Sequence, residues 1–202
     1  SHDTSVAVVN VDDEQCTFVD NKFKVFIDAY ETTANVKIDA GVEHSTIKHI
    51  MEDLSEVMGV STLSYEVDTS DLSCQVFTST FTVIAEDGTE KEYEIELTSK
   101  NDDNTISEVS VNDVVLRPNE DHIVYADGTY GLIQVVGETA KVKVIATNDL
   151  TRVEFAGDSK LKELEKIVTL SEEEKITEVP VRLISQQGSV YETIIYIERV
   201  SN

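Results

Sequence analysis

The sequence predicts a mainly β protein: two tandem antiparallel β-sandwiches, each with a short helical insert that is longer in the first sandwich. Three observations lead to this fold class. Apolar and polar residues alternate along most of the chain, which is the period of a half-buried strand. A strand–turn–strand pattern occurs twice, at residues 80–97 and 179–197, about 100 residues apart. The length of 202 residues is enough for two domains of about 100 residues, each with its own core.

Short alternating segments separated by turns indicate six or seven strands in each half, the number typical of a β-sandwich. We expect them at residues 6–11, 23–27, 35–39, 63–67, 74–85 and 91–97, and at residues 106–116, 130–136, 141–146, 152–155, 167–170, 177–185 and 191–200. A second internal match supports the repeat, because a Glu-Thr pair precedes an alternating segment at both 31–38 and 138–145.

One segment of the first half, residues 45–58, departs from the alternating pattern. Its apolar residues fall at the spacing of one helix face: Ile47, Ile50, Met51, Leu54, Val57 and Met58. Ser45 or Thr46 is suited to cap the first turn, and Gly59 follows the last one. The pattern predicts an amphipathic helix of about three turns that either covers one end of a sheet or binds a partner. A weaker echo of it begins after Asp158 in the second half.

The polar residues 98–105 form the linker candidate between the two halves. We therefore expect a first domain at residues 1–99, a linker at 100–104 and a second domain at 105–202. A linker this short gives the two domains little freedom relative to each other.

The charge of the chain excludes two classes of partner. Its 40 acidic and 16 basic residues give a net charge of -24, which repels nucleic-acid phosphates and anionic lipids. The sequence contains no apolar run near the roughly 20 residues that a membrane span needs, and no signal peptide. Ser1 and His2 are typical of the remnant of a cleaved tag, so we expect an excised fragment of an extracellular or cell-surface protein.

The repeated turn carries a resemblance to a known family. Residues 81–95 read FTVIAEDGTEKEYEI and resemble the hairpin that closes bacterial cadherin-like β-sandwich domains, which reads VxAEDGxxxxYxI in that family. The second copy departs from this motif, with SQQG at 185–188 and Tyr191 two residues nearer to the glycine. The resemblance implies two Ig-like sandwiches in tandem, as in secreted or wall-attached multimodular proteins, and no enzymatic activity.

On this resemblance we expect a non-catalytic structural or adhesive pair of modules that acts as a spacer, an anchor or a protein-binding unit. Its partners would be another protein or neighbouring domains of the same polypeptide. The alternative is a glycan-binding accessory module of a secreted carbohydrate-active protein. The aromatic residues best placed to stack on a sugar are Tyr125 and Tyr130, which flank a turn at 127–128.

The residues that could carry chemistry are few. The four histidines are His2, His44, His49 and His122, and no nucleophile-elbow pattern accompanies them. The sequence therefore predicts that the protein is not an enzyme. The only two cysteines, Cys16 and Cys74, both lie in the first half and could be bridged or free.

Calcium is the one cofactor that the sequence brings into question. Four consecutive oxygen-bearing side chains lie between the two halves: Asn101, Asp102, Asp103 and Asn104. Calcium takes six to eight oxygen ligands, and the cluster is similar in composition to the Asp- and Asn-rich linkers of cadherins. The same residue types also form Asx turns in solvated linkers, so the sequence leaves both interpretations open.

Overall fold

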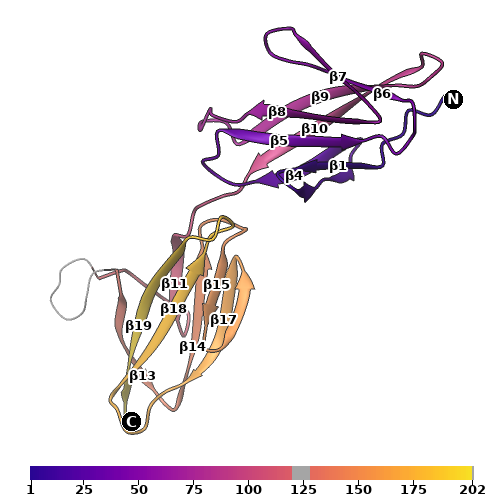
Figure 1. Cartoon of the computed structure of the whole chain (residues 1–202). Coiled ribbons are helices and arrows are strands. Elements are labelled where there is room, and N and C mark those ends of the chain that lie inside the picture. Colours follow the sequence, from indigo (N-terminus) through magenta and orange to yellow (C-terminus); the bar gives the residue numbers. More distant parts are fainter. Residues whose placement is uncertain (120–127, 202) are drawn as a thin grey trace. The chain divides into compact units, whose positions relative to one another are not determined.

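The computed structural model describes residues 1–119 and 128–201. Its contacts group the chain into two compact units, Ser1–Lys100 and Asn101–Asn202. Each unit consists of two β-sheets that enclose a separate hydrophobic core. Figure 1 shows the strands of each unit.

The first unit contains a four-stranded and a six-stranded sheet. The four-stranded sheet has the order β2-β1-β5-β8 and the six-stranded sheet the order β3-β4-β10-β9-β6-β7. The strands are β1 (Val8–Val11), β2 (Glu14–Gln15), β3 (Thr17–Val19), β4 (Lys22–Ile27), β5 (Thr33–Asp39), β6 (Thr46–Ile50), β7 (Glu56–Val60), β8 (Thr62–Asp68), β9 (Val76–Ile84) and β10 (Glu90–Ser99).

The second unit repeats this arrangement with sheets of four and five strands, ordered β12-β11-β14-β17 and β13-β19-β18-β15-β16. The strands are β11 (Ile106–Val111), β12 (Val114–Leu116), β13 (Tyr130–Val136), β14 (Thr139–Ala146), β15 (Arg152–Phe155), β16 (Asp158–Leu161), β17 (Glu163–Thr169), β18 (Ile176–Ile184) and β19 (Val190–Val200).

The cores follow from the alternation of the sequence. Along β10, the side chains of Tyr93, Ile95 and Leu97 point inward and are buried, while the glutamates between them are more exposed. Along β19, Ile195 and Ile197 occupy the same kind of inward position. Each such side chain contributes about 1.5 to 3 kcal/mol when it is fully buried, so each unit has the means to stabilise itself.

The prediction of a helix at residues 45–58 is wrong. These residues form the β6–β7 hairpin, in which the side chain of Ile47 is buried against the core and that of Leu54 is exposed at the tip. The apolar residues at helical spacing are divided between the two faces and the tip of the hairpin. Leu54 has φ +66°, a left-handed conformation that does not fit a helix.

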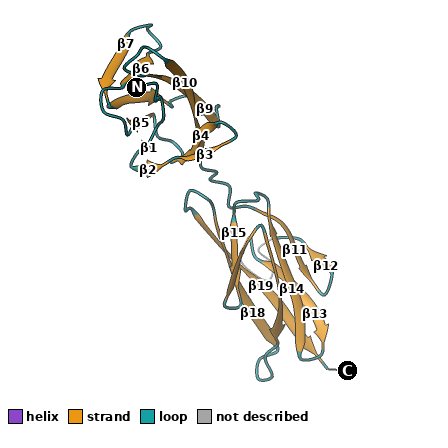
Figure 2. Ribbon diagram, turned by 90° about the vertical axis from the view of Figure 1, so that its right-hand side faces the viewer, coloured by secondary structure: helices purple, strands orange, loops and turns teal. Residues whose placement is uncertain are grey.

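The weaker echo of a helix in the second unit is also wrong. The residues after Asp158 form β16 and then β17. In the part of the chain that the structure describes there is no helix, and both units are all-β (Figure 2). No helix able to span a membrane is found among the described residues.

The sheets are mixed and not purely antiparallel, which corrects a further detail of the predicted fold class. In the first unit β10 pairs in parallel with β4, for example Ile95 opposite Phe23. In the second unit β19 pairs in parallel with β13, for example Ile195 opposite Tyr130. In both units the last strand is therefore held between a parallel and an antiparallel neighbour.

The chain enters and leaves each unit at opposite ends of the last strand. In the first unit the Tyr93 hydroxyl donates to the Thr4 carbonyl at 2.8 Å, which places the N-terminal segment near the start of β10. In the second unit the Gln187 amide donates to the Asn101 carbonyl at 3.1 Å, at the turn before β19. Because the last strands run away from these turns, each unit releases the chain at its other end.

Candidate functional site

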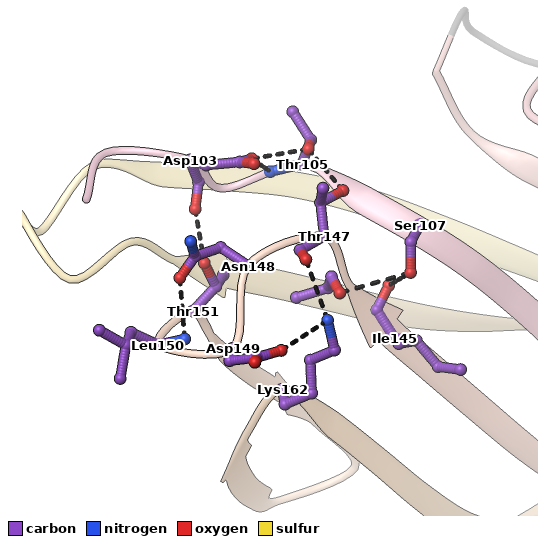
Figure 3. A network of polar contacts seen from close by, with 11 residues as sticks. Asp103, Thr105, Ser107, Ile145, Thr147, Asn148, Asp149, Leu150, Thr151 and Lys162 are labelled. Atoms are coloured by element: carbon purple, nitrogen blue, oxygen red, sulfur yellow. Dashed lines mark hydrogen bonds and ion pairs between the residues drawn. The ribbon is translucent and has the colours of Figure 1, made fainter.

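The Asp- and Asn-rich segment folds back on the second unit. The Asp103 carboxylate accepts hydrogen bonds from the Thr105 amide at 2.8 Å and from the Thr105 hydroxyl at 2.6 Å, which makes an Asx turn. The Thr105 and Thr147 hydroxyl oxygens lie 2.8 Å apart, and the Thr151 hydroxyl donates to the Asp103 carbonyl (Figure 3). These bonds attach the segment to the loop between β14 and β15.

A second set of bonds attaches the same segment to the turn between β18 and β19. The Asp102 carboxylate accepts from the hydroxyls of Ser185, at 2.8 Å, and of Ser189. The Asn101 amide donates to the side-chain oxygen of Gln186 at 2.9 Å. The segment is thus a hydrogen-bonded first stretch of the second unit.

The calcium hypothesis gains no support from this geometry. One carboxylate oxygen of Asp102 and one of Asp103 already accept hydrogen bonds from hydroxyl and amide groups. Within residues 1–119 and 128–201, no three His, Cys, Asp or Glu side chains gather closely enough to hold a metal ion. A calcium site at Asn101–Asn104 stays a prediction.

Of the two tyrosines that the sequence offers for stacking on a sugar, the structure describes only Tyr130. Tyr125 lies outside the described residues. Tyr130 begins β13, its side chain is only 7% exposed, and burial raises the pKa of its hydroxyl. A ring in this position packs in the core and does not offer a face to a sugar. Glycan binding through this pair stays a prediction.

The two cysteines are unbridged in the structure. Cys16 is buried and Cys74 is exposed. Burial raises the pKa of the Cys16 thiol to about 11, so this residue is protonated at neutral pH and behaves as a small core side chain.

The first unit carries a groove of about 710 Å³ beneath the β6–β7 hairpin, which we call the hairpin groove. Its walls come from the hairpin, from β8 and from β9, and Figure 1 shows the tip of the hairpin projecting from the unit. It is lined by Thr32, Thr33, His49, Ile50, Met51, Glu52, Asp53, Glu66, Val67, Asp68, Ser70, Thr78, Ser79 and Thr80. A space of this size is within the range of sites that bind small ligands.

A histidine fixes one end of the hairpin groove. The His49 Nδ1 donates to the Thr80 carbonyl at 2.7 Å, and the imidazole stacks on the Tyr65 ring with centroids 3.7 Å apart. The Tyr65 and Ser79 hydroxyl oxygens lie 2.9 Å apart, and burial raises the pKa of Tyr65 to about 12. These contacts connect the hairpin to β8 and β9 and hold this wall in place.

The other walls of the hairpin groove are acidic. Glu52 and Asp53 belong to the hairpin and Glu66 and Asp68 to β8, whereas none of the described lining residues is Lys or Arg. Hydrogen bonds from Ser55 lower the pKa of Asp53, and those from Ser70 lower the pKa of Asp68. The groove is therefore negatively charged at neutral pH.

Sequence reasoning missed the hairpin groove, although a local signal for the turn was present. Asp53 and Ser55 stand two residues apart, and the Asp53 carboxylate accepts from the Ser55 amide at 2.9 Å. Such an Asp-x-Ser pair is typical of an Asx turn and argues against a continuous helix. Asp68 and Ser70, on the opposite wall, repeat the pattern at 2.8 Å.

Comparison with known proteins gives similarity to solved structures alone. No protein-family model and no curated protein matches the chain. An ice-binding, Ca²⁺-stabilised adhesin of an Antarctic bacterium is 16% identical, over 98% of this chain and 50% of that one, with a TM-score of 0.32. Murine CEACAM1b is 11% identical, over 88% of this chain and 96% of that one, with a TM-score of 0.36. Immunoglobulin domains 1–4 of Sidekick-1 are 11% identical, over 97% of this chain and 50% of that one, with a TM-score of 0.40.

The chain thus spans half the length of the adhesin and of the Sidekick-1 fragment. With these identities and TM-scores the comparison assigns neither a family nor a role to the chain.

Proposed function

We propose that the chain is a non-catalytic pair of cadherin-like modules that serves as a load-bearing spacer and adhesive unit of a bacterial cell-surface or secreted multimodular protein. The observation that carries this proposal is the path of the chain through each unit. The N-terminal segment lies beside the turn that precedes the last strand, and the chain leaves at the far end of that strand. A module with its two ends at opposite poles lengthens a polypeptide and does not fold it back.

The position of the last strand supports a load-bearing role. β10 lies between β4 and β9, and β19 lies between β13 and β18. A pull along either strand acts across two hydrogen-bonded ladders at once, so it has to disrupt both of them before the strand can leave. A terminal strand at a sheet edge would have only one ladder to break.

The separate cores support the proposal that each unit is a domain. One cluster of buried residues belongs to the first unit and another to the second. The hydrogen bonds of Asn101 and Asp102 to the β18–β19 turn favour a second domain that begins at its linker-like segment.

Single-molecule stretching of the chain between its two termini tests this function. We expect two separate unfolding steps, each releasing about 300 Å, because 100 extended residues reach about 330 to 360 Å. One combined step, or extension without measurable resistance, would reject the load-bearing role.

A further inference from the structure

Part of one edge of β9 is unpaired in the described residues. β6 pairs with β9 only where Thr46, Ile47 and Lys48 face Ile84, Val83 and Thr82. Beyond Lys48 the hairpin leaves the sheet, and the stretch of β9 from Thr78 to Thr80 lines the hairpin groove. In the part of the chain that the structure describes, no strand pairs with this stretch on the side away from β10.

The backbone of this stretch is directed toward the groove. The Ala85 amide donates to the Thr89 carbonyl, and the Ser99 amide to the Gln75 carbonyl, so odd-numbered residues of β9 exchange hydrogen bonds with β10. The even-numbered residues Thr78 and Thr80 then turn their amide and carbonyl groups to the other side. The Thr80 carbonyl accepts from His49, which leaves the amides of Thr78 and Thr80 as donors on the groove side.

The negative charge of the groove indicates which kind of partner segment can bind there. Four carboxylates line it, and the described lining includes no Lys or Arg. A segment that carries Lys or Arg is attracted to such a surface. A second copy of this chain, with a net charge of -24, is repelled by it.

We propose that the hairpin groove is the docking site for an extended, basic segment of a partner protein, which adds to the free edge of β9 as a further strand. Main-chain hydrogen bonds to the outward amides of Thr78 and Thr80 would supply affinity, as in other cases of strand addition. This inference rests on the adhesive part of the proposed function and leaves the load-bearing part unaffected.

The walls of the groove define the side-chain pattern of the partner. Successive side chains of a strand point to opposite faces. Basic residues then meet the carboxylates of Glu52 and Glu66 from one face, while apolar residues between them contact Ile50, Met51 and Val67. The matching segment alternates Lys or Arg with small apolar residues.

Titration of the whole chain with a short peptide in which Lys and Val alternate tests the docking. The comparison peptide alternates Glu and Val. We expect the Lys peptide to bind and to slow hydrogen exchange at the amides of Thr78 and Thr80. The amides of Phe77 and Ser79 serve as an internal control, because their bonds to β10 protect them before the peptide is added. Binding of both peptides alike, or no added protection at Thr78 and Thr80, overturns the proposal.

Two substitutions with matched controls separate strand addition from general attraction to an acidic protein. Thr80→Pro removes the outward amide donor of Thr80 and keeps its carbonyl, which accepts from His49. As the control, Val115→Pro removes the amide of a residue on β12, an edge strand of the second unit. Glu66→Lys reverses a charge in the groove, and Glu178→Lys makes the same change on β18. We expect the dissociation constant to rise about tenfold for Thr80→Pro and Glu66→Lys, and to stay within about twofold for the controls. Equal losses in all four variants refute the site.

The unmodified chain provides a check that needs no variant. Sedimentation of the chain without peptide is expected to show a monomer with unprotected Thr78 and Thr80 amides. A concentration-dependent dimer that protects these amides would make a second copy the occupant and contradict the basic partner.

Discussion

The β6–β7 hairpin of the first unit and the β15–β16 hairpin of the second begin in the same way and end differently. β6 pairs with β9 over three residues opposite Ile84, Val83 and Thr82, and β15 pairs with β18 over three residues opposite Ile184, Leu183 and Arg182. In the second unit the hairpin then closes at a two-residue turn, Ala156 and Gly157, both with positive φ. In the first unit it continues to a longer loop and overhangs the groove.

The sheet edge beyond this pairing also differs between the units. Thr80 stands on β9 four residues before Ile84, and Pro180 stands on β18 four residues before Ile184. A proline has no amide to donate, and at an edge it prevents another strand from pairing. The second unit thus carries a blocked edge where the first unit carries an open one. The two units therefore differ in whether this edge can accept a further strand, and Pro180 shows that a proline is compatible with the fold of the second unit at this register.

The largest effect is expected from removing the same core side chain in each unit. Ile95 and Ile195 are fully buried at matching places in the last strands. Changing either one to Ala should destabilise its own unit by about 2 to 5 kcal/mol, because a cavity replaces packed atoms. Unfolding by denaturant, followed by hydrogen exchange in each unit, measures this. Ile95→Ala should lower only the transition of the first unit and Ile195→Ala only that of the second. A shift of both transitions by one substitution would show that the two units unfold together.

The similarity of the units could be predicted from the sequence, because strand alternation is a local property. Residues 91–97 alternate, and β10 buries Tyr93, Ile95 and Leu97 on one side as the period of two requires. Pro180, inside an alternating segment, was a visible sign of an edge position.

The difference between the units could not be predicted in the same way. The helical spacing at residues 45–58 arose because apolar side chains occupy both faces and the tip of the hairpin. The hairpin groove depends on where β6 leaves β9, which is decided by packing between residues distant in the sequence, such as His49 and Tyr65. No local pattern reports that contact.

Exchanging the edge residues, Thr80 of β9 and Pro180 of β18, tests the same comparison with a smaller expected change in stability. Pro180→Thr restores an outward amide to β18, and Thr80→Pro removes one from β9. Because neither amide lies on the side that bonds to the last strand, we expect each substitution to change the stability of its unit by less than about 1 kcal/mol. Denaturant unfolding of the variants measures this. A loss of several kcal/mol would mean that these amides are part of a ladder.

A buried carboxylate, which the first unit does not carry at the matching place, should contribute to the acid sensitivity of the second unit. Glu198 on β19 is 5% exposed, bonds to the Lys175 ammonium and accepts from Gln134 at 2.7 Å; Thr98 follows Leu97 at the matching place on β10. Lys175 and then Gln134 lower the pKa of Glu198 in the folded state. Its stabilising contribution is therefore complete above the unfolded pKa of about 4.3 and declines as the pH falls through the lower folded value.

Denaturant unfolding of the second unit between about pH 3 and pH 6 checks the role of Glu198. Glu198→Gln should flatten the fall in stability on the acid side. Glu178→Gln, a substitution of an exposed residue on β18, should leave it unchanged. Equal slopes in the unmodified chain and in Glu198→Gln would exclude Glu198 as the source.

The smallest effect concerns the uneven charge of the two units. The first unit has 21 acidic and 6 basic residues, a net charge of -15, and the second has 19 acidic and 10 basic residues, a net charge of -9. Like charges repel more in the first unit, and salt screens this repulsion over a Debye length of about 10 Å at 0.1 M. Added sodium chloride should therefore raise the thermal midpoint of the first unit more than that of the second.

Glu66→Lys, which relieves repulsion in the hairpin groove, should reduce the salt response of the first unit. An equal response of the two units would mean that surface ion pairs, such as Lys22 with Glu94 and Glu96 at 3.0 and 2.9 Å, offset the excess charge of the first unit when salt screens them.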